Sequence, residues 1–318
     1  MIRTLTAKPG SDSAGAAARP PAWVEQLVDA TGRTGGGSEG IALEIAAGKR
    51  FTLVSAWVDE HLVRDGAGLR DATIGAYGLI RAVLAESNTP YPVRFWNHIG
   101  DITQPAVNGV DPAVGDGRDA NRYMAFNAGR FAAMSQWYGG PERFDASLPT
   151  ASGVGYDGRG LIVHCLASRQ PGRAVANPRQ VQPHRYSARY GPRPPCFSRA
   201  TILTADVPAP LVLVGGTASI RGEVSMFEND LSAQFAETLA NLSSLLTAAG
   251  AADGAAGLAT LRELRVYYRD ASDAAPIAAM VRSQLASVGQ PQTVRAGLCR
   301  PELLVEIEGL ADCSGVQR

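Results

Sequence analysis

The chain has 318 residues, 45% of them hydrophobic, and its 30 Lys+Arg balance its 30 Asp+Glu. A neutral chain of this size can form one large or two medium domains, and it lacks the basic excess typical of a nucleic-acid-binding protein. No segment approaches the roughly 18 consecutive apolar residues of a membrane span, and the first thirty residues lack the apolar core of a secretory signal. We therefore expect a cytoplasmic protein without nucleic-acid or membrane partners.

The cysteines and histidines show no spacing typical of a metal site or of a disulfide framework. They are Cys165, Cys196, Cys299 and Cys313, with His61, His98, His164 and His184. Phosphate-binding and serine-hydrolase motifs are also absent, and the glycine run at residues 35–38 is expected to be a flexible loop. The sequence therefore predicts no metal and no cofactor.

In the first half, strands and helices alternate after a flexible tail, which we place at residues 1–40 because it begins with many Ala, Gly, Pro and Ser residues. Branched and aromatic side chains predict strands, and apolar residues at helical spacing predict helices. The expected elements are a strand at 51–58, a helix at 71–87, a strand at 93–99, a helix at 119–138 and a strand at 161–167. These elements define an N-terminal half at residues 41–168.

A Pro- and Arg-rich connector at residues 169–200 shows no periodicity, and a stretch of this kind inside a compact protein is usually functional or disordered. We expect the connector to contribute to the site. The C-terminal half, residues 201–318, repeats the alternation. Its expected elements are a strand at 211–214 that runs into glycines, a helix at 230–249, a strand at 264–269, a helix at 274–288 and a strand at 303–310.

The fold class predicted from this alternation is α+β, with two related βαβαβ-type halves. Each half is expected to have a mixed sheet with helices packed on one face.

Two acidic residues lie on one face of the last predicted strand. Leu303, Val305 and Ile307 alternate with Glu306 and Glu308, so the apolar face is the core face and the carboxylates lie opposite. On a solvated face they would be ordinary surface acids. In a cleft, burial and mutual repulsion would raise the pKa of one of them and produce a general acid.

Arginine and tyrosine residues cluster around the connector and the strand at 264–269. Such a cluster either stabilises the fold by stacking or binds a small anion such as a compact dicarboxylate, and Arg300 just before the last strand could hold a carboxylate bidentately. The other members are Arg185, Tyr186, Arg189, Tyr190, Arg193, Arg199, Arg265, Tyr267 and Arg269.

Several segments together resemble the chorismatase family, from about residue 50 onward. The matching segments are Arg94–Ile102, Arg122–Arg130, Arg185–Ala200, Val214–Glu223, Leu264–Asp270 and Cys299–Gly309. The second half also resembles the reactive-intermediate deaminase (YjgF-like) fold, on which chorismatases are built. This resemblance agrees with the two related halves inferred from the alternation of elements.

The resemblance implies cleavage of chorismate, a dianionic enol ether, with release of pyruvate. Glu306 matches the catalytic glutamate that protonates the enol ether, and Glu308 would supply a like charge that helps to hold the proton. Cys299, seven residues earlier, matches the members that form 3-hydroxybenzoate by internal displacement to an arene oxide followed by aromatisation. Gly215 matches a second marker of those members, with the adjacent Gly216 as the other possible register.

The candidate substrate contacts are Tyr186, Arg193, Arg199, Gly215, Arg269 and Arg300. The predicted reaction is conversion of chorismate to 3-hydroxybenzoate and pyruvate by a monomer or a trimer. Hydrolysis to a trans-dihydroxycyclohexadiene carboxylate and formation of mixed 3- and 4-hydroxybenzoate remain alternatives. An enamine/imine deaminase and a non-catalytic sensor of small aromatic acids on the same fold are further alternatives.

Overall fold

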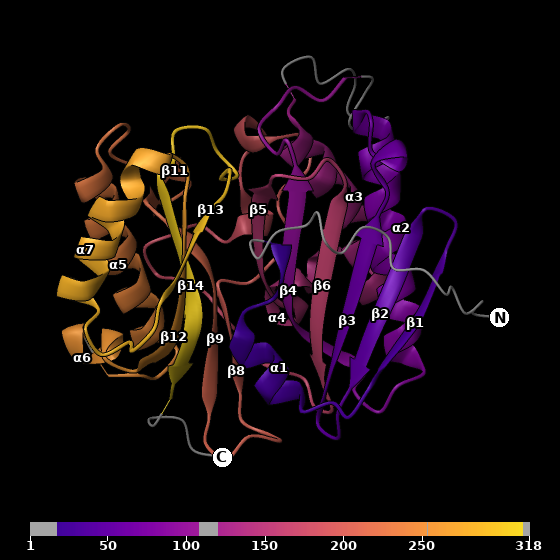
Figure 1. The fold of residues 1–318 in the computed structure, drawn as a ribbon, viewed down its shortest axis with the longest axis horizontal. Coiled ribbons are helices and arrows are strands. Elements are labelled where there is room, and N and C mark those ends of the chain that lie inside the picture. The colour runs from indigo at the N-terminus through magenta and orange to yellow at the C-terminus, as the bar shows by residue number, and fades with distance from the viewer. Residues whose placement is uncertain (1–17, 108–119, 253, 314–318) are drawn as a thin grey trace.

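Two six-stranded mixed sheets lie with their helix-free faces toward each other in a computed structural model that describes residues 18–107, 120–252 and 254–313 (Figure 1). The first sheet contains β1 (Arg33–Ser38), β2 (Ile41–Ala47), β3 (Phe51–Val58), β4 (Tyr91–Gly100), β5 (Thr150–Tyr156) and β6 (Leu161–Ser168). Helices α2 (Gly66–Ala85) and α3 (Arg122–Tyr138) cover its outer face.

The second sheet contains β7 (Arg173–Val175), β8 (Ala200–Leu203), β9 (Leu211–Ala218), β12 (Leu261–Tyr268), β13 (Gln292–Arg295) and β14 (Val305–Asp312). Helices α5 (Leu231–Ala248), α6 (Gly254–Leu258) and α7 (Ala274–Gln284) lie on its outer side. Short elements complete the described chain: α1 (Ala22–Val28), α4 (Phe144–Ser147), β10 (Ile220–Arg221) and β11 (Val224–Ser225).

The two halves share one topology. The first sheet has the order β1-β2-β3-β6-β4-β5, and the second, listed from its opposite edge, has the order β7-β8-β9-β14-β12-β13. In each sheet only the corresponding pair, β4–β5 or β12–β13, is parallel. The predicted α+β fold with two related halves, mixed sheets and helices on one face is therefore confirmed. Each sheet contains three strands more than the predicted βαβαβ pattern: β1, β2 and β5 in the first sheet, and β7, β8 and β13 in the second.

Side-chain caps fix the starts of the three long helices. Asp65 accepts a hydrogen bond from Gly68 N–H at the start of α2, and Asn121 accepts one from Met124 N–H at the start of α3. Asp230 caps α5 in the same way. Such caps satisfy backbone donors that lack partners within the helix. The apolar faces of these helices then complete the two outer cores.

The space between the sheets is apolar at one end and polar at the other. The apolar end holds Trp96, Leu166, Leu213 and Leu310, against which α1 packs. The polar end holds buried groups from both sheets: Arg94, Ser152, Arg265, Tyr267, Glu306 and Glu308. The predicted alternation in β14 is confirmed, because Val305 and Ile307 belong to the core under the helices. Its acidic face meets the other sheet and not solvent.

Part of the predicted flexible tail is ordered structure. Residues 1–17 lie outside the described residues, but 22–28 form α1 with Trp23 and Val24 buried, and 33–38 form the edge strand β1. The glycine run expected to be a loop is therefore a strand, because it pairs antiparallel with β2. The start of the connector likewise forms β7 at the edge of the second sheet. Within the described residues no helix is both long and apolar enough to span a membrane.

Candidate active site

A cavity of about 170 Å³ lies between the polar ends of the sheets, under the connector. Both halves and the connector supply its walls, so the site is formed within a single chain. The lining includes Tyr123, Met124 and Ser152 of the first half, Tyr186, Tyr190, Phe197 and Arg199 of the connector, and Gly216, Cys299, Arg300, Glu302 and Glu306 of the second half.

Glu306 lines this cavity from β14 and is 4% exposed. Burial and, to a smaller extent, the nearby negative charge of Glu308 raise the pKa of its carboxyl, and with the opposing effect of Arg94 and Arg199 the pKa is about 8. No hydrogen bond to this carboxyl occurs among the described residues. At neutral pH Glu306 therefore presents a proton to the cavity.

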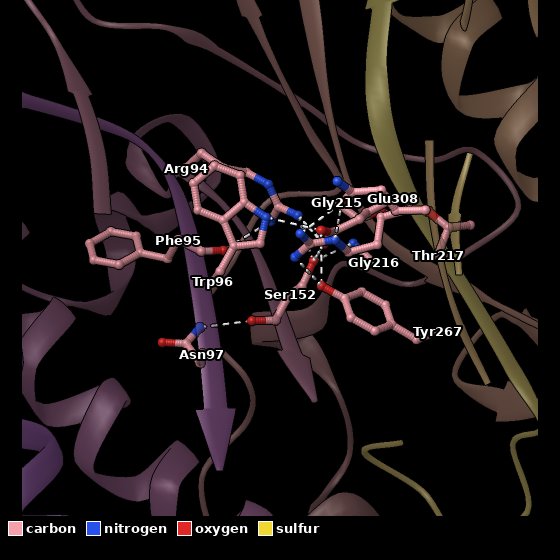
Figure 2. A network of polar contacts seen from close by, with 12 residues as sticks. Arg94, Phe95, Trp96, Asn97, Ser152, Gly215, Gly216, Thr217, Tyr267 and Glu308 are labelled. Carbon is pink, nitrogen blue, oxygen red and sulfur yellow. Dashed lines mark hydrogen bonds and ion pairs between the residues drawn. The ribbon is translucent and has the colours of Figure 1, made fainter. Parts of the chain in front are cut away.

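Glu308, two residues along the same face, points away from the cavity and into a set of donors (Figure 2). Arg94 Nη2 lies 2.7 Å from its Oε2, and Trp96 Nε1 donates to its Oε1 at 3.0 Å. Tyr267 also donates to Oε1 at 3.0 Å, and Ser152 donates to Oε2. The two acids that the sequence places on one face thus occupy different environments.

Cys299 lines the cavity as predicted, but as a neutral thiol. Burial raises the pKa of the thiol to about 12, and the negative charge of a nearby ionised Glu306 acts in the same direction. A thiolate at rest, which is the reactive form of cysteine, is therefore disfavoured at this position.

Two arginines of the predicted cluster reach the cavity, each held along one edge. Arg199 donates through Nη2 to Tyr186 Oη at 2.6 Å, while its buried Nε has no partner. Arg300 donates through Nη1 to Glu223 O at 2.8 Å and to Ser225 Oγ at 3.0 Å. Its guanidinium stacks on Tyr190, 3.8 Å from the ring centroid. These contacts orient both guanidinium groups at the wall of the cavity.

The connector is fastened to both halves. On one side Asp145 pairs with His184 and Arg185. On the other side Glu223 accepts hydrogen bonds from the backbone N–H and the hydroxyl of Ser187. At and just after these anchors the segment carries Tyr186 and Tyr190, which line the cavity. The connector therefore forms one wall of the site, and its basic residues are held at fixed positions.

Three predicted contacts lie elsewhere. Arg193 stacks over Phe131 at 5.2 Å, and Arg269 binds Asp270 and the carbonyl of Pro301, and neither lines the cavity. Gly215 does not line it either, because a Cβ there would meet Arg199 O and Thr150. Of the two possible registers for the pocket glycine, the structure favours Gly216.

An irregularity in the pairing of β9 with β14 explains the positions of Gly215 and Gly216. The register shifts between Ile307 and Gly309, so that Gly215 and Gly216 together lie opposite one residue. Both glycines consequently face β5 of the other sheet. A Cβ on Gly216 would lie 1.9 Å from Oε1 of Glu306, so only glycine leaves the carboxyl its present position.

Sequence reasoning missed the residues that the first half contributes. Tyr123 and Ser152 line the cavity, and Arg94 and Trp96 hold Glu308 from behind. Arg94 and Trp96 are two residues apart on β4 and therefore share one face of the strand. This spacing in a predicted strand was a usable signal for a face that carries hydrogen-bond donors. Ser152 lies in a strand that the sequence did not predict. Among the described residues, no group of three or more His, Cys, Asp or Glu is placed to hold a metal ion.

Comparison with known proteins identifies the family. The model described as chorismatase FkbO/Hyg5-like, N-terminal, matches residues 29–167. A 3-hydroxybenzoate synthase from Streptomyces hygroscopicus is 34% identical over 248 residues, which cover 76% of this chain and 69% of that protein. The chain belongs to the chorismatase family.

Other members agree with this assignment. A chorismatase from Streptomyces rapamycinicus is 30% identical over 78% of this chain and 72% of that protein. A crystal structure of a chorismatase superposes with a TM-score of 0.73 at 25% identity, covering 87% of this chain and 79% of that one. The superposition spans both halves of this chorismatase-family member, and the inter-sheet cavity lies between them.

Proposed function

We propose that this protein converts chorismate to 3-hydroxybenzoate and pyruvate in the cavity between its two sheets, with a cytoplasmic location. The observation that carries the proposal is a buried, protonated carboxyl, Glu306, that faces a cavity with two oriented arginines and Cys299. The family relationship supports the substrate, because the named relatives are a 3-hydroxybenzoate synthase and chorismatases.

The two arginines suit a dianion. Chorismate carries one carboxylate on its ring and one on its enolpyruvyl side chain. Among the described residues, Arg199 and Arg300 each have guanidinium N–H groups without a protein acceptor, and a carboxylate accepts a forked pair of donors well. The aromatic walls Tyr123, Tyr186 and Phe197 offer flat surfaces to the ring.

The first step is transfer of the Glu306 proton to the methylene carbon of the enol ether. This transfer gives an oxocarbenium-like side chain, whose bond to the ring then breaks with the electron pair passing to the ether oxygen, and pyruvate results. The neighbouring ring hydroxyl displaces the side chain and closes an arene oxide, and its proton passes to the Glu306 carboxylate, which becomes a carboxylic acid again. A carboxyl whose pKa lies near the working pH suits general acid catalysis of this kind.

Aromatisation then requires removal of the proton on the ring carbon that carried the side chain. Because Cys299 is a thiol at rest, we assign it a coupled role in which it gives its proton to the epoxide oxygen as the ring opens and takes the ring proton as thiolate. The epoxide opens, its oxygen gains a proton, and both side chains recover their starting states. The sum of the two products equals chorismate in atoms, so the reaction consumes no water.

Incubation of the purified protein with chorismate tests the proposal. Chromatography should show pyruvate and 3-hydroxybenzoate in equal amounts. Formation of the trans-dihydroxycyclohexadiene carboxylate would assign the hydrolytic reaction, and additional 4-hydroxybenzoate would assign the mixed one. Ammonia release from dehydroamino acids would point to the deaminase alternative. Tight binding of chorismate with no pyruvate would contradict the proposal.

A further inference from the structure

Glu308 has hydrogen-bond donors on both oxygens of its carboxylate. Each carboxylate oxygen receives two donors: Oε1 those of Trp96 and Tyr267, and Oε2 those of Arg94 and Ser152. A guanidinium and an indole N–H can only donate, so a proton on Glu308 would have to displace one of these bonds. Side chains from three strands of both sheets, β4, β5 and β12, thus converge on one carboxylate that is 2% exposed.

Ser152 joins this arrangement to the cavity. Its hydroxyl donates to Glu308 and accepts from Arg94 Nη2 at 2.5 Å and from the backbone N–H of Gly216 at 3.0 Å. One O–H and two lone pairs are all that a serine hydroxyl offers, so the group has no capacity left for a substrate. Although it lines the cavity, Ser152 therefore holds Gly216, which in turn packs against the Glu306 carboxyl.

We propose that Glu308 is a positioning residue that keeps the catalytic proton on Glu306, because its own oxygens are saturated by donors from both halves of the chain. This inference rests on the proposed function and adds a role for the first half in the acid step. The fixed negative charge behind Glu306 opposes its ionisation, and the saturated oxygens prevent the proton from moving to Glu308. The assembled interface between the two sheets thereby sets the protonation state of the acid.

Both negative and positive groups surround the Glu306 carboxyl. Glu308 of the same strand opposes ionisation of Glu306, whereas Arg94 of β4 and Arg199 of the connector favour it. The other titratable groups near the Glu306 carboxyl are Tyr123 of α3, Tyr267 of β12, and Cys299, Arg300 and Glu302 of the segment before β14. Among these groups Glu308 is the carboxylate that receives four hydrogen-bond donors.

The test is the substitution Glu308→Gln, followed by the pH dependence of chorismate turnover. Gln keeps a carbonyl acceptor for the donors but removes the charge, so the alkaline limb of kcat/KM should move about one to two pH units lower. Glu308→Asp, which retains the charge, should restore the limb toward its original position. Glu142→Gln, at an exposed site on the surface, is the matched control and should leave the limb unmoved. An unmoved limb in Glu308→Gln would overturn the proposal.

Infrared difference spectra supply a readout that needs neither turnover nor the Glu308 variant. At neutral pH the wild-type protein should show a protonated carboxyl band that is absent from Glu306→Gln. Persistence of the band in Glu306→Gln would show that Glu308 carries the proton and would overturn the proposal. If wild-type protein failed to convert chorismate, the proposed function would fail, while the spectra would still locate the proton.

Discussion

Substitution of Gly216 by Ala tests the placement of the acid at atomic scale. The added Cβ would lie 1.9 Å from Oε1 of Glu306 and 2.8 Å from its Cδ. Because a carbon–oxygen contact settles at roughly 3.3 Å, the carboxyl must move by about 1.4 Å. A displacement of about 1 Å at a reacting group can reduce the rate about a hundredfold.

We therefore expect kcat/KM of Gly216→Ala for chorismate to fall by roughly two orders of magnitude, with product analysis by chromatography beside the rate assay. The melting temperature should change little, because the displaced atoms are the end of a side chain. Gly78→Ala is the control, since a Cβ on that helical glycine meets nothing within 4 Å. Wild-type kcat/KM in Gly216→Ala would refute the argument that the carboxyl must occupy its present position.

Three further predictions concern the same cavity. Cys299→Ala should leave KM for chorismate nearly unchanged and divert product toward the dihydroxycyclohexadiene carboxylate; an unchanged product in chromatography would remove Cys299 from aromatisation. Arg300→Met should raise KM about 10- to 100-fold, the value of a lost charged hydrogen bond, whereas the exposed Arg282→Met should not; equal KM values in steady-state kinetics would exclude Arg300 as a carboxylate contact. In denaturant titrations, wild-type protein should lose stability relative to Glu306→Gln as pH rises from about 4.5 to about 8, by a few kcal/mol at most. The raised pKa gives this sign, because the unfolded carboxyl ionises first, and a constant difference across that range would contradict it.

The sequence predicted the central strands and helices of both halves but missed the same three strands in each. For β1 and β7 the reason lies in where the strands obtain their stability. β1 contains three consecutive glycines and β7 has only three residues, so neither carries a local strand signal. Both lie at the edge of a sheet and form by pairing with a neighbour. Periodicity detects strands with a buried face, and these short edge strands have little of one.

Local patterns located the acids but not their different surroundings. The alternation in β14 placed Glu306 and Glu308 on one face, yet only packing of the first sheet directs donors onto Glu308 and leaves Glu306 in the cavity. Sequence spacing likewise could not distinguish the roles of Arg300 and Arg269. Arg300 reaches the cavity, whereas Arg269 binds its sequence neighbour Asp270. Such distinctions depend on contacts between residues far apart in the chain.

The pH dependence of chorismate turnover by wild-type protein and by Glu306→Gln tests the central claim most directly. Wild-type protein should release pyruvate at a rate that falls as pH rises through about 8. Glu306→Gln should lose at least about a hundredfold in kcat at every pH, because it has no acid to donate. Pyruvate release by Glu306→Gln at the wild-type rate would contradict the assignment of Glu306 as the acid.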